Sequence, residues 1–354
     1  MREIRALKRV TWAAFGRRRR VVLAAGCLAA VAVCAAAGAP EARHASAKRY
    51  RYPWPVVPFD RPHSIVGSFG EPRTTFFGPP RRASLFGRGL FFFHNGIDVP
   101  APADTPVYAV ASGIADVPYP TIVRVRSSGG PTFEYWHIKP VVAPGQVVVA
   151  RRTILGRIRR RPGHVHVKEV AGGVVTNPLA PGGIGPSPDR TSPRIDTITF
   201  RRPGSGRTLL PGHLGGRVFF VTDAVDPPGP DVDAPRRQMP LVPALITWRV
   251  ERWDPLYDHW QRVVVIPTRI AVDFRSTLPH ARDFWRVYAR GTYQNAATFF
   301  RYHDSIGPGS YLFKLTPRAF DTHALADGTY DLVVTASDIA GNRGSLRQRF
   351  TIDN

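Results

Sequence analysis

The chain has 354 residues and a formal net charge of +23, and 43% of its residues are hydrophobic. Its two cysteines, Cys27 and Cys34, both lie near the N-terminus, so the rest of the chain cannot form a disulfide framework. Stability must therefore come from packed cores, and a chain of this length can form two domains.

The first 47 residues have the pattern of an export signal. Arg17 to Arg20 precede the uncharged, mostly apolar stretch Val21–Ala39, and Ala45-Ser46-Ala47 offers a small-residue cleavage pattern. Because the apolar stretch is barely long enough to span a bilayer, a cleaved signal is favoured over a permanent membrane anchor, which stays the alternative. We therefore expect an exported protein that is periplasmic, cell-wall associated or extracellular.

Basic charge continues beyond this segment. Residues 1–47 carry a net charge of +7, which leaves +16 for the remainder. Such a balance attracts polyanions, for which nucleic acid, anionic cell-wall polymers and lipid headgroups are the candidates. Arginines that only solvate the surface are the alternative. Since no nucleic-acid-binding motif is present, we expect no nucleic-acid partner and favour a wall polymer such as peptidoglycan.

Proline and glycine divide the following region into short segments. Residues 48–64 predict a proline-rich, extended lead-in with little regular structure. Beyond it, short apolar runs broken by turns show scarcely any helical periodicity, which predicts an all-β fold. The predicted strands are Pro106–Ala111, Ile122–Arg126, Thr132–His137, Gln146–Ala150 and His164–Val170.

His94 and Asp98 stand four residues apart, a spacing that restricts how they can share a metal ion. A straight strand would separate them by about 13 Å. Both can bind one ion only if the chain bends between them, and Asn95-Gly96 is a strong turn or bulge dipeptide.

His164 and His166 lie on one face of their predicted strand because they are two residues apart. Two imidazoles and one carboxylate are the usual ligands of a catalytic zinc. One histidine of this pair could bind the metal, and the other, with His137, could handle protons. The alternatives are ordinary core or surface histidines and a structural zinc site, which the lack of cysteine ligands disfavours.

A series of short motifs runs in order through this part of the chain. They are Ser68-Phe69-Gly70, His94 to Asp98, Pro106 to Gly113, Tyr135 to His137, Gly145 to Val148, Ile154-Leu155-Gly156 and Gly163 to His166. With these motifs, the stretch from about Ile65 to Val170 resembles the lysostaphin-type zinc metallopeptidases, the M23 or LytM family.

The resemblance implies a domain over residues 65–176 with an antiparallel sheet groove that holds one zinc ion. It further implies that His94, Asp98 and His166 are the ligands and that His137 and His164 orient the water and stabilise the transition state. The implied activity is an endopeptidase that cuts peptide bonds of bacterial peptidoglycan. A non-catalytic wall-binding or regulatory protein that retains the fold is the alternative.

The C-terminal part of the chain continues the β pattern. Residues 177–193, rich in proline and glycine, predict a linker, and residues 194–354 predict an Ig-like sandwich region. The stretch 325–353 resembles the last hairpin of a bacterial Ig-like or fibronectin-type sandwich, with an Asp-x-Ala-Gly-Asn turn at Asp338. The aromatic clusters Phe284-Trp285 and Phe299 to Tyr302 are expected in a core, and a ligand-binding face is the alternative.

Overall fold

The computed structural model describes residues 50–75, 90–160, 163–187, 189–229, 239–256, 259–295 and 308–354. Contacts divide the chain into two compact units, Met1–Ser46 and Ala47–Asn354, and the described residues all belong to the second unit. The predicted export signal, residues 1–47, therefore lies outside the described residues. In the described ranges, no helix is long and apolar enough to cross a membrane.

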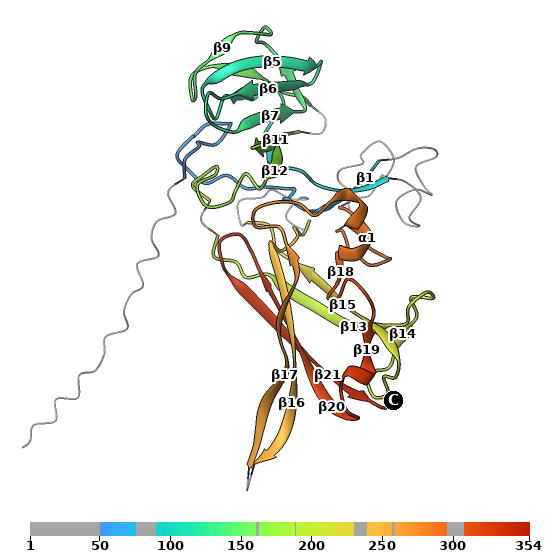
Figure 1. Ribbon diagram of the computed structural model, residues 1–354. Helices are drawn as coiled ribbons and strands as arrows, with labels where there is room; N and C mark the ends of the chain where they lie inside the picture. Colours follow the sequence, from blue (N-terminus) through green and yellow to red (C-terminus); the bar gives the residue numbers. More distant parts are fainter. Residues whose placement is uncertain are drawn as a thin grey trace, which may run out of the picture. The chain divides into compact units, whose positions relative to one another are not determined.

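Antiparallel β-strands make up nearly all the regular structure of the described residues, which confirms the predicted all-β fold (Figure 1). Within those residues, helix is confined to α1 (Phe284–Val287) and the 3-10 turns η3 (Ala281–Asp283) and η5 (Thr322–Ala324). Short runs between proline and glycine leave too few residues for long helices, whereas strands of this length are ordinary.

One antiparallel sheet carries the predicted metal site. Its strand order is β12-β11-β7-β6-β5-β9 (Figure 1). Strand β3 also pairs with β11, over His164–Val167, next to the stretch of β11 that pairs with β12. The strands are β3 (Ile97–Pro100), β5 (Gly113–Tyr119), β6 (Ile122–Arg126), β7 (Thr132–Trp136), β9 (Val147–Val148), β11 (His164–Ala171) and β12 (Val174–Thr176).

Two smaller strand groups accompany this sheet. One has the order β4-β10-β8, with β4 (Pro106–Tyr108), β8 (Ile138–Pro140) and β10 (Ile154–Ile158). The other is the ribbon of β1 (Pro72–Thr75) and β2 (Leu90–Phe93). All five strands that the sequence predicts in this region overlap an observed strand, namely β4, β6, β7, β9 and β11.

Side chains along these strands point alternately to a core face and to the face that carries the candidate site. Phe133 and Tyr135 of β7 and Val165 and Val167 of β11 are fully buried in one hydrophobic cluster. Since successive strand residues point to opposite faces, the histidines that flank Val165 lie on the other face of β11. The core therefore fixes the strand that presents them.

The C-terminal residues form two further antiparallel sheets (Figure 1). In one, the order β14-β13-β15-β18 joins β14 (Thr208–Leu209), β13 (Arg194–Arg201), β15 (Arg217–Val225) and β18 (Leu312–Lys314), and β19 (Phe320–Asp321) also pairs with β15. In the other, the order β17-β16-β20-β21 joins β17 (His259–Asp273), β16 (Leu245–Leu256), β20 (Gly328–Ser337) and β21 (Arg343–Ile352). Side chains of both sheets meet in one core cluster. The Ig-like assignment stays a prediction.

This second core also takes in residues from the N-terminal part of the described chain. Phe69 and Phe93 belong to it, and the Phe93 ring packs against those of Phe274 and Tyr288. The predicted linker is packed as well: Ile184 is fully buried in the first core. The domain boundaries at 177–193 stay a prediction, but contacts cross them.

The aromatic residues near position 284 belong mainly to this core. Phe284 is 2% exposed and packs against Phe91 and Phe93, whereas Trp285 is 40% exposed. The second aromatic cluster, Phe299 to Tyr302, lies outside the described residues. The expectation of a packed core therefore holds for Phe284 and only partly for its neighbour.

Candidate metal centre

The chain bends between His94 and Asp98, as their spacing requires. Strand β2 ends at Phe93 and β3 begins at Ile97, and His94 Nε2 lies 3.3 Å from Asp98 Oδ1. Gly96 is needed here for close packing, because a Cβ atom would meet the backbone oxygen of Val167 and come within 2.7 Å of His166 Cε1. Its φ is not in the left-handed region, so space rather than backbone freedom explains the glycine.

Strand pairing brings the next residue of the cluster into place. On the antiparallel strands β3 and β11, Asp98 and His166 are directly opposed, which places their Cβ atoms about 5 Å apart. The fully buried Val99 and Val165 pack in the core beneath them and fix this register. A slip of one residue would turn Asp98 and His166 to opposite faces.

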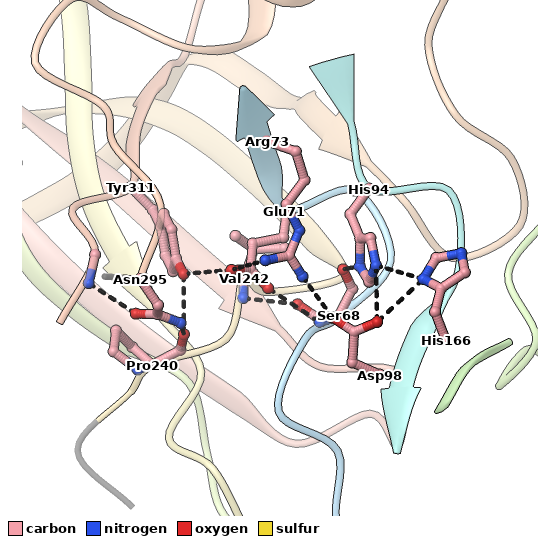
Figure 2. A network of polar contacts seen from close by, with 12 residues as sticks. Ser68, Glu71, Arg73, His94, Asp98, His166, Pro240, Val242, Asn295 and Tyr311 are labelled. Carbon is pink, nitrogen blue, oxygen red and sulfur yellow. Dashed lines mark hydrogen bonds and ion pairs between the residues drawn. The ribbon is translucent and has the colours of Figure 1, made fainter. Parts of the chain in front are cut away.

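Three side-chain atoms converge as a result (Figure 2). His94 Nε2 lies 2.8 Å from His166 Nδ1, and His166 Nδ1 lies 3.0 Å from Asp98 Oδ1. All three side chains are about 95% buried. Within the described residues these three form a group whose nitrogen and oxygen atoms could hold one metal ion. His164 Nε2 lies 3.4 Å from Asp98 Oδ1 but does not belong to that group.

A backbone contact fixes the tautomer of His94. Its Nδ1 lies 2.8 Å from the carbonyl oxygen of Ser68. A carbonyl only accepts hydrogen bonds, so Nδ1 carries the proton and Nε2 directs a lone pair toward Asp98 and His166. This is the arrangement by which an outer partner orients a metal-binding imidazole.

Arg73 holds the other oxygen of the Asp98 carboxylate. Its Nη2 donates to Asp98 Oδ2 at 2.8 Å, which leaves Oδ1 facing the two histidines (Figure 2). Gly67 makes this ion pair possible, because a Cβ atom there would overlap both Arg73 Nη2 and Asp98 Oδ2. The glycine thus provides the space in which a buried cation reaches the cluster.

Residues of the C-terminal part of the chain supply further contacts of this network (Figure 2). Arg73 Nη1 lies 3.5 Å from Oε1 of Glu71, a fully buried carboxyl group. The Tyr311 hydroxyl, 240 residues further along the chain, donates to Glu71 Oε1 at 2.9 Å. A backbone amide from the same part of the chain, Val242 N–H, donates to Ser68 Oγ at 3.0 Å. The outer contacts of the cluster therefore come from both parts of the chain.

Burial and neighbouring charge keep the histidines neutral. Burial, helped by the Arg73 cation, lowers the pKa of His94 to about 4. Burial also lowers the pKa of His164 to about 4, although Asp98 opposes this shift. Burial alone would raise the pKa of Asp98, but His94, His164 and Arg73 together hold it well below its usual range. At neutral pH Asp98 is therefore a carboxylate beside the neutral imidazoles of His94 and His164.

His137 lies beside this group, between β7 and β8. Its ring centroid is 5.0 Å from that of His164 and 6.3 Å from that of His166. Burial and the nearby His164 lower its pKa to about 3. Its backbone adopts a left-handed conformation with φ of 66°, which is uncommon for a residue other than glycine. The strained turn aims a neutral imidazole toward the other histidines.

The donor atoms fit zinc in kind and in spacing. Ligands at about 2.0–2.2 Å in a tetrahedral arrangement are roughly 3.3 Å from one another. The separations among His94 Nε2, Asp98 Oδ1 and His166 Nδ1 are 2.8, 3.0 and 3.3 Å, close to that value. Two imidazoles and one carboxylate also match the ligand types of catalytic zinc sites.

The sequence did not reveal the residues that support the cluster. Glu71 and Arg73 closely follow the Ser68-Phe69-Gly70 motif. Two residues of opposite charge at this spacing only weakly indicate a buried ion pair. Tyr311 carries no local signal, because only the tertiary structure brings it to Glu71.

Comparisons with known proteins find only limited similarity. No family model matches the chain, and no curated protein matches its sequence. A chain of the SpoIIQ–SpoIIIAH pore-forming complex is 21% identical, over 37% of this chain and 89% of that one, with a TM-score of 0.28. The catalytic domain of a prophage-encoded M23 protein from Enterococcus faecalis is 24% identical, over 37% and 93%, with a TM-score of 0.23.

A third similar structure is a zinc-containing peptidase from Vibrio cholerae. It is 25% identical over 34% of this chain and 36% of that one, with a TM-score of 0.26. M23 peptidases are thus among the similar solved structures, but TM-scores this low carry no argument about activity. The site has to be interpreted from its own geometry.

Proposed function

We propose that this protein is an exported, zinc-dependent endopeptidase that cleaves peptide bonds of bacterial peptidoglycan. One observation carries the proposal: the buried donor atoms of His94, Asp98 and His166 lie within 3.3 Å of one another. The neutral imidazoles of His137 and His164 lie at the edge of this group. The resemblance of residues 65–170 to M23 peptidases rests on the same residues.

In this proposal His94, Asp98 and His166 hold one zinc ion. When bound, zinc supplies a Lewis acid for the scissile carbonyl and lowers the pKa of a bound water toward roughly 7. Ser68 and Arg73 orient two of the ligands. Ser68 accepts from His94 Nδ1–H and leaves Nε2 for the metal, and Arg73 binds Asp98 Oδ2 and leaves Oδ1 for it.

His137 and His164 act on protons and developing charge. Each is a neutral imidazole at pH 7, so each has one nitrogen that accepts a proton and one N–H that donates. One ring can take a proton from the attacking water while the other donates to the carbonyl oxygen as it gains negative charge. General acid–base catalysis and such charge stabilisation each contribute typically about 10²- to 10⁴-fold.

The setting follows from charge and from the N-terminal pattern. The net charge of +16 beyond residue 47 favours an anionic wall polymer as the partner, and the basic, apolar and small-residue segments in order favour export. N-terminal sequencing of the exported protein should find a mature chain that begins near Lys48. A membrane-bound protein that retains Met1 would contradict cleavage and identify an anchor.

A non-catalytic wall-binding or regulatory protein is the second candidate. It would retain the fold without cutting, whereas the complete set of ligand and helper histidines favours the enzyme. Hydrolysis of purified cell walls separates the two, because a binding protein would sediment with walls without releasing peptide.

The deciding experiment measures zinc content and wall hydrolysis for the same set of variants. His94→Ala, Asp98→Ala and His166→Ala should lose both zinc and activity, since the folded site depends on its full ligand set. His137→Ala and His164→Ala should keep zinc and lose about 10²-fold or more of the activity. The exposed His213 gives the matched control, and His213→Ala should retain both.

Two outcomes would contradict this assignment. Wild-type protein that binds no zinc would refute the enzyme and leave the wall-binding function. A His164→Ala protein without zinc, together with a His166→Ala protein that retains it, would reverse the roles of that pair.

A further inference from the structure

A second group of acidic side chains, two of them buried and one half-buried, lies in the C-terminal part of the molecule. Asp189, Asp226 and Asp338 each offer a carboxylate oxygen, and these oxygens lie within 4.8 Å of one another. Asp189 comes from the segment before β13, Asp226 directly follows β15, and Asp338 directly follows β20. The cluster therefore joins three segments that are far apart in the sequence.

The Asp226 carboxylate is buried, and no cation among the described residues pairs with it. Its side chain is 8% exposed, and its Oδ1 atom is inaccessible to solvent and has no hydrogen-bond partner. In the described ranges, no lysine or arginine forms an ion pair with any of the three carboxylates. A buried carboxylate that faces two others is strongly destabilising unless a proton or a cation neutralises the group.

Hydrogen bonds hold the other two aspartates in position, and the Thr191 amide donates to Asp189 Oδ1 at 2.8 Å. The amides of Gly341 and Asn342 donate to Asp338 Oδ1 at 2.6 and 2.9 Å. The Asn342 side chain donates to Asp338 Oδ2 at 2.6 Å and to the backbone oxygen of Asp189 at 2.9 Å. The Asp-x-Ala-Gly-Asn turn thus fixes both its own aspartate and the approach of the segment that carries Asp189.

Electrostatics agree with this geometry. Burial, followed by the neighbouring Asp338 and Asp189, raises the pKa of Asp226 well above its usual range. Burial and the nearby Asp189 also raise the pKa of Asp338, although its hydrogen bonds from Asn342 and Gly341 oppose the shift. A positively charged ligand would consequently stabilise this cluster.

We infer that Asp189, Asp226 and Asp338 form a calcium-binding site that fastens the segment before β13 to the β20–β21 hairpin. All the donors are oxygens, which select a hard cation, and calcium accepts irregular sets of six to eight oxygens. Two oxygens on one calcium at about 2.3–2.6 Å are at most about 5.2 Å apart, so a spread of 4.8 Å is compatible.

Calcium at this place would connect the two parts of the described chain. Ile339, next to Asp338, packs against the hydrophobic cluster that contains Val99 and Val165 of the candidate zinc sheet. A cation that holds Asp338 also holds the turn that carries Ile339. The inference is independent of the proposed peptidase activity, since it uses none of the zinc-site residues.

The test is thermal unfolding of the full chain, first stripped by a chelator and then titrated with calcium from about 10⁻⁶ to 10⁻² M, a range that covers sensor and extracellular sites. Calcium should raise the melting temperature by about 5 °C at a hundredfold excess over its dissociation constant. The increase should persist after zinc has been added, and magnesium at the same concentration should give a smaller one.

Variants assign the effect to the cluster. Asp226→Asn keeps the shape and removes the charge, so it should abolish the calcium-dependent increase while the calcium-free protein melts no lower than wild type. Asp189→Asn provides an independent variant should the first fail to fold. Asp196→Asn is the control, because Asp196 is an exposed aspartate paired with Arg194, and it should retain the full increase.

Two results would overturn the inference. Calcium that leaves the wild-type melting temperature unchanged would mean that protonation alone neutralises the cluster. A calcium effect that survives in both Asp226→Asn and Asp189→Asn would place the ion elsewhere. Calorimetric titration of calcium into wild type and the Asp226→Asn variant gives a direct second readout.

Discussion

Asp98 and Asp226 are both buried aspartates at the centre of a side-chain cluster, but their surroundings are opposite. Asp98 faces neutral imidazoles and the Arg73 cation, and its pKa is held well below the usual range. Asp226 faces two further carboxylates, and its pKa is raised well above that range. Burial acts in the same direction on both, so the neighbours decide the outcome.

The difference indicates which cation each cluster would take. The Asp98 cluster offers two nitrogens and one oxygen, with its single negative charge already paired, which suits zinc. The Asp226 cluster offers oxygens and uncompensated negative charge, which suits calcium. Perturbing one cluster should therefore leave the response of the other unchanged.

The largest expected effect is the acid sensitivity of the metal-free protein. The pKa values of His94 and His164 fall to about 4, and that of His137 falls to about 3, from 6.5 in the unfolded chain. Between these values the unfolded state binds more protons, so stability is complete above pH 6.5 and is lost as the pH falls. Each histidine contributes roughly 1.4 kcal/mol per pH unit in that window.

Denaturant unfolding in chelator at several pH values measures this slope. His137→Ala should make it shallower by the share of one histidine. The Asp226 carboxyl group acts in the opposite sense, because a raised pKa adds stability at low pH that is lost as the pH rises through the folded value. In the Asp226→Asn variant, the free energy of unfolding should therefore fall more steeply with decreasing pH than in the wild type. A stability independent of pH from 7 to 4 would contradict the buried, neutral histidines.

Removal of the Arg73 cation should have the next largest effect. Arg73→Met leaves the buried Asp98 carboxylate without its ion pair, which typically costs about 3–5 kcal/mol of folding free energy. Zinc affinity should fall about 10- to 100-fold, because Asp98 loses its orientation. Arg126→Met is the control, since Arg126 and Asp116 form an exposed pair worth at most about 1 kcal/mol. A changed calcium response in the Arg73→Met variant would contradict the independence of the two clusters.

Gly96→Ala should disturb metal binding without changing any charged group. In Gly96→Ala the new Cβ atom would collide with the Val167 oxygen and the His166 ring. Overpacking of this kind costs typically about 1–3 kcal/mol, and displacement of His166 should lower the zinc content measured by elemental analysis. Gly212→Ala introduces the same methyl group into open space and should bind zinc normally. Full zinc content in Gly96→Ala would show that His166 is not confined as described.

The smallest effect is expected at Tyr311, which reaches the zinc-site cluster only through Glu71 and Arg73. Tyr311→Phe removes the hydroxyl that donates to the buried Glu71, at a cost of about 1–3 kcal/mol. A modest loss of zinc affinity should accompany it, because Glu71 contacts Arg73, which positions Asp98. Tyr330→Phe removes a hydroxyl that donates to the Ala326 carbonyl, and it should leave zinc affinity unchanged. Equal zinc affinity in both variants would show that the C-terminal sheets do not support the site.

Much of the fold and of the candidate site follows from local sequence pattern. Alternating residues predict β7 and β11 because strand periodicity depends only on neighbours in the chain. The bend at Asn95-Gly96 and the shared face of His164 and His166 follow from the same short-range rules, and both are present. The roles assigned to the histidines, and the zinc ion itself, stay predictions.

Local pattern in the chain determined the β-rich class, and the resemblance to M23 peptidases pointed to the five residues of the candidate centre. Local spacing left either His164 or His166 as the partner of His94 and Asp98, and the resemblance implied His166. Only the tertiary structure places His166 opposite Asp98 and in one group with His94, because that placement depends on strand register. It also placed Tyr311 behind Glu71 and brought Asp189, Asp226 and Asp338 together. Contacts between residues more than 100 positions apart depend on how sheets pack, and no local pattern encodes that.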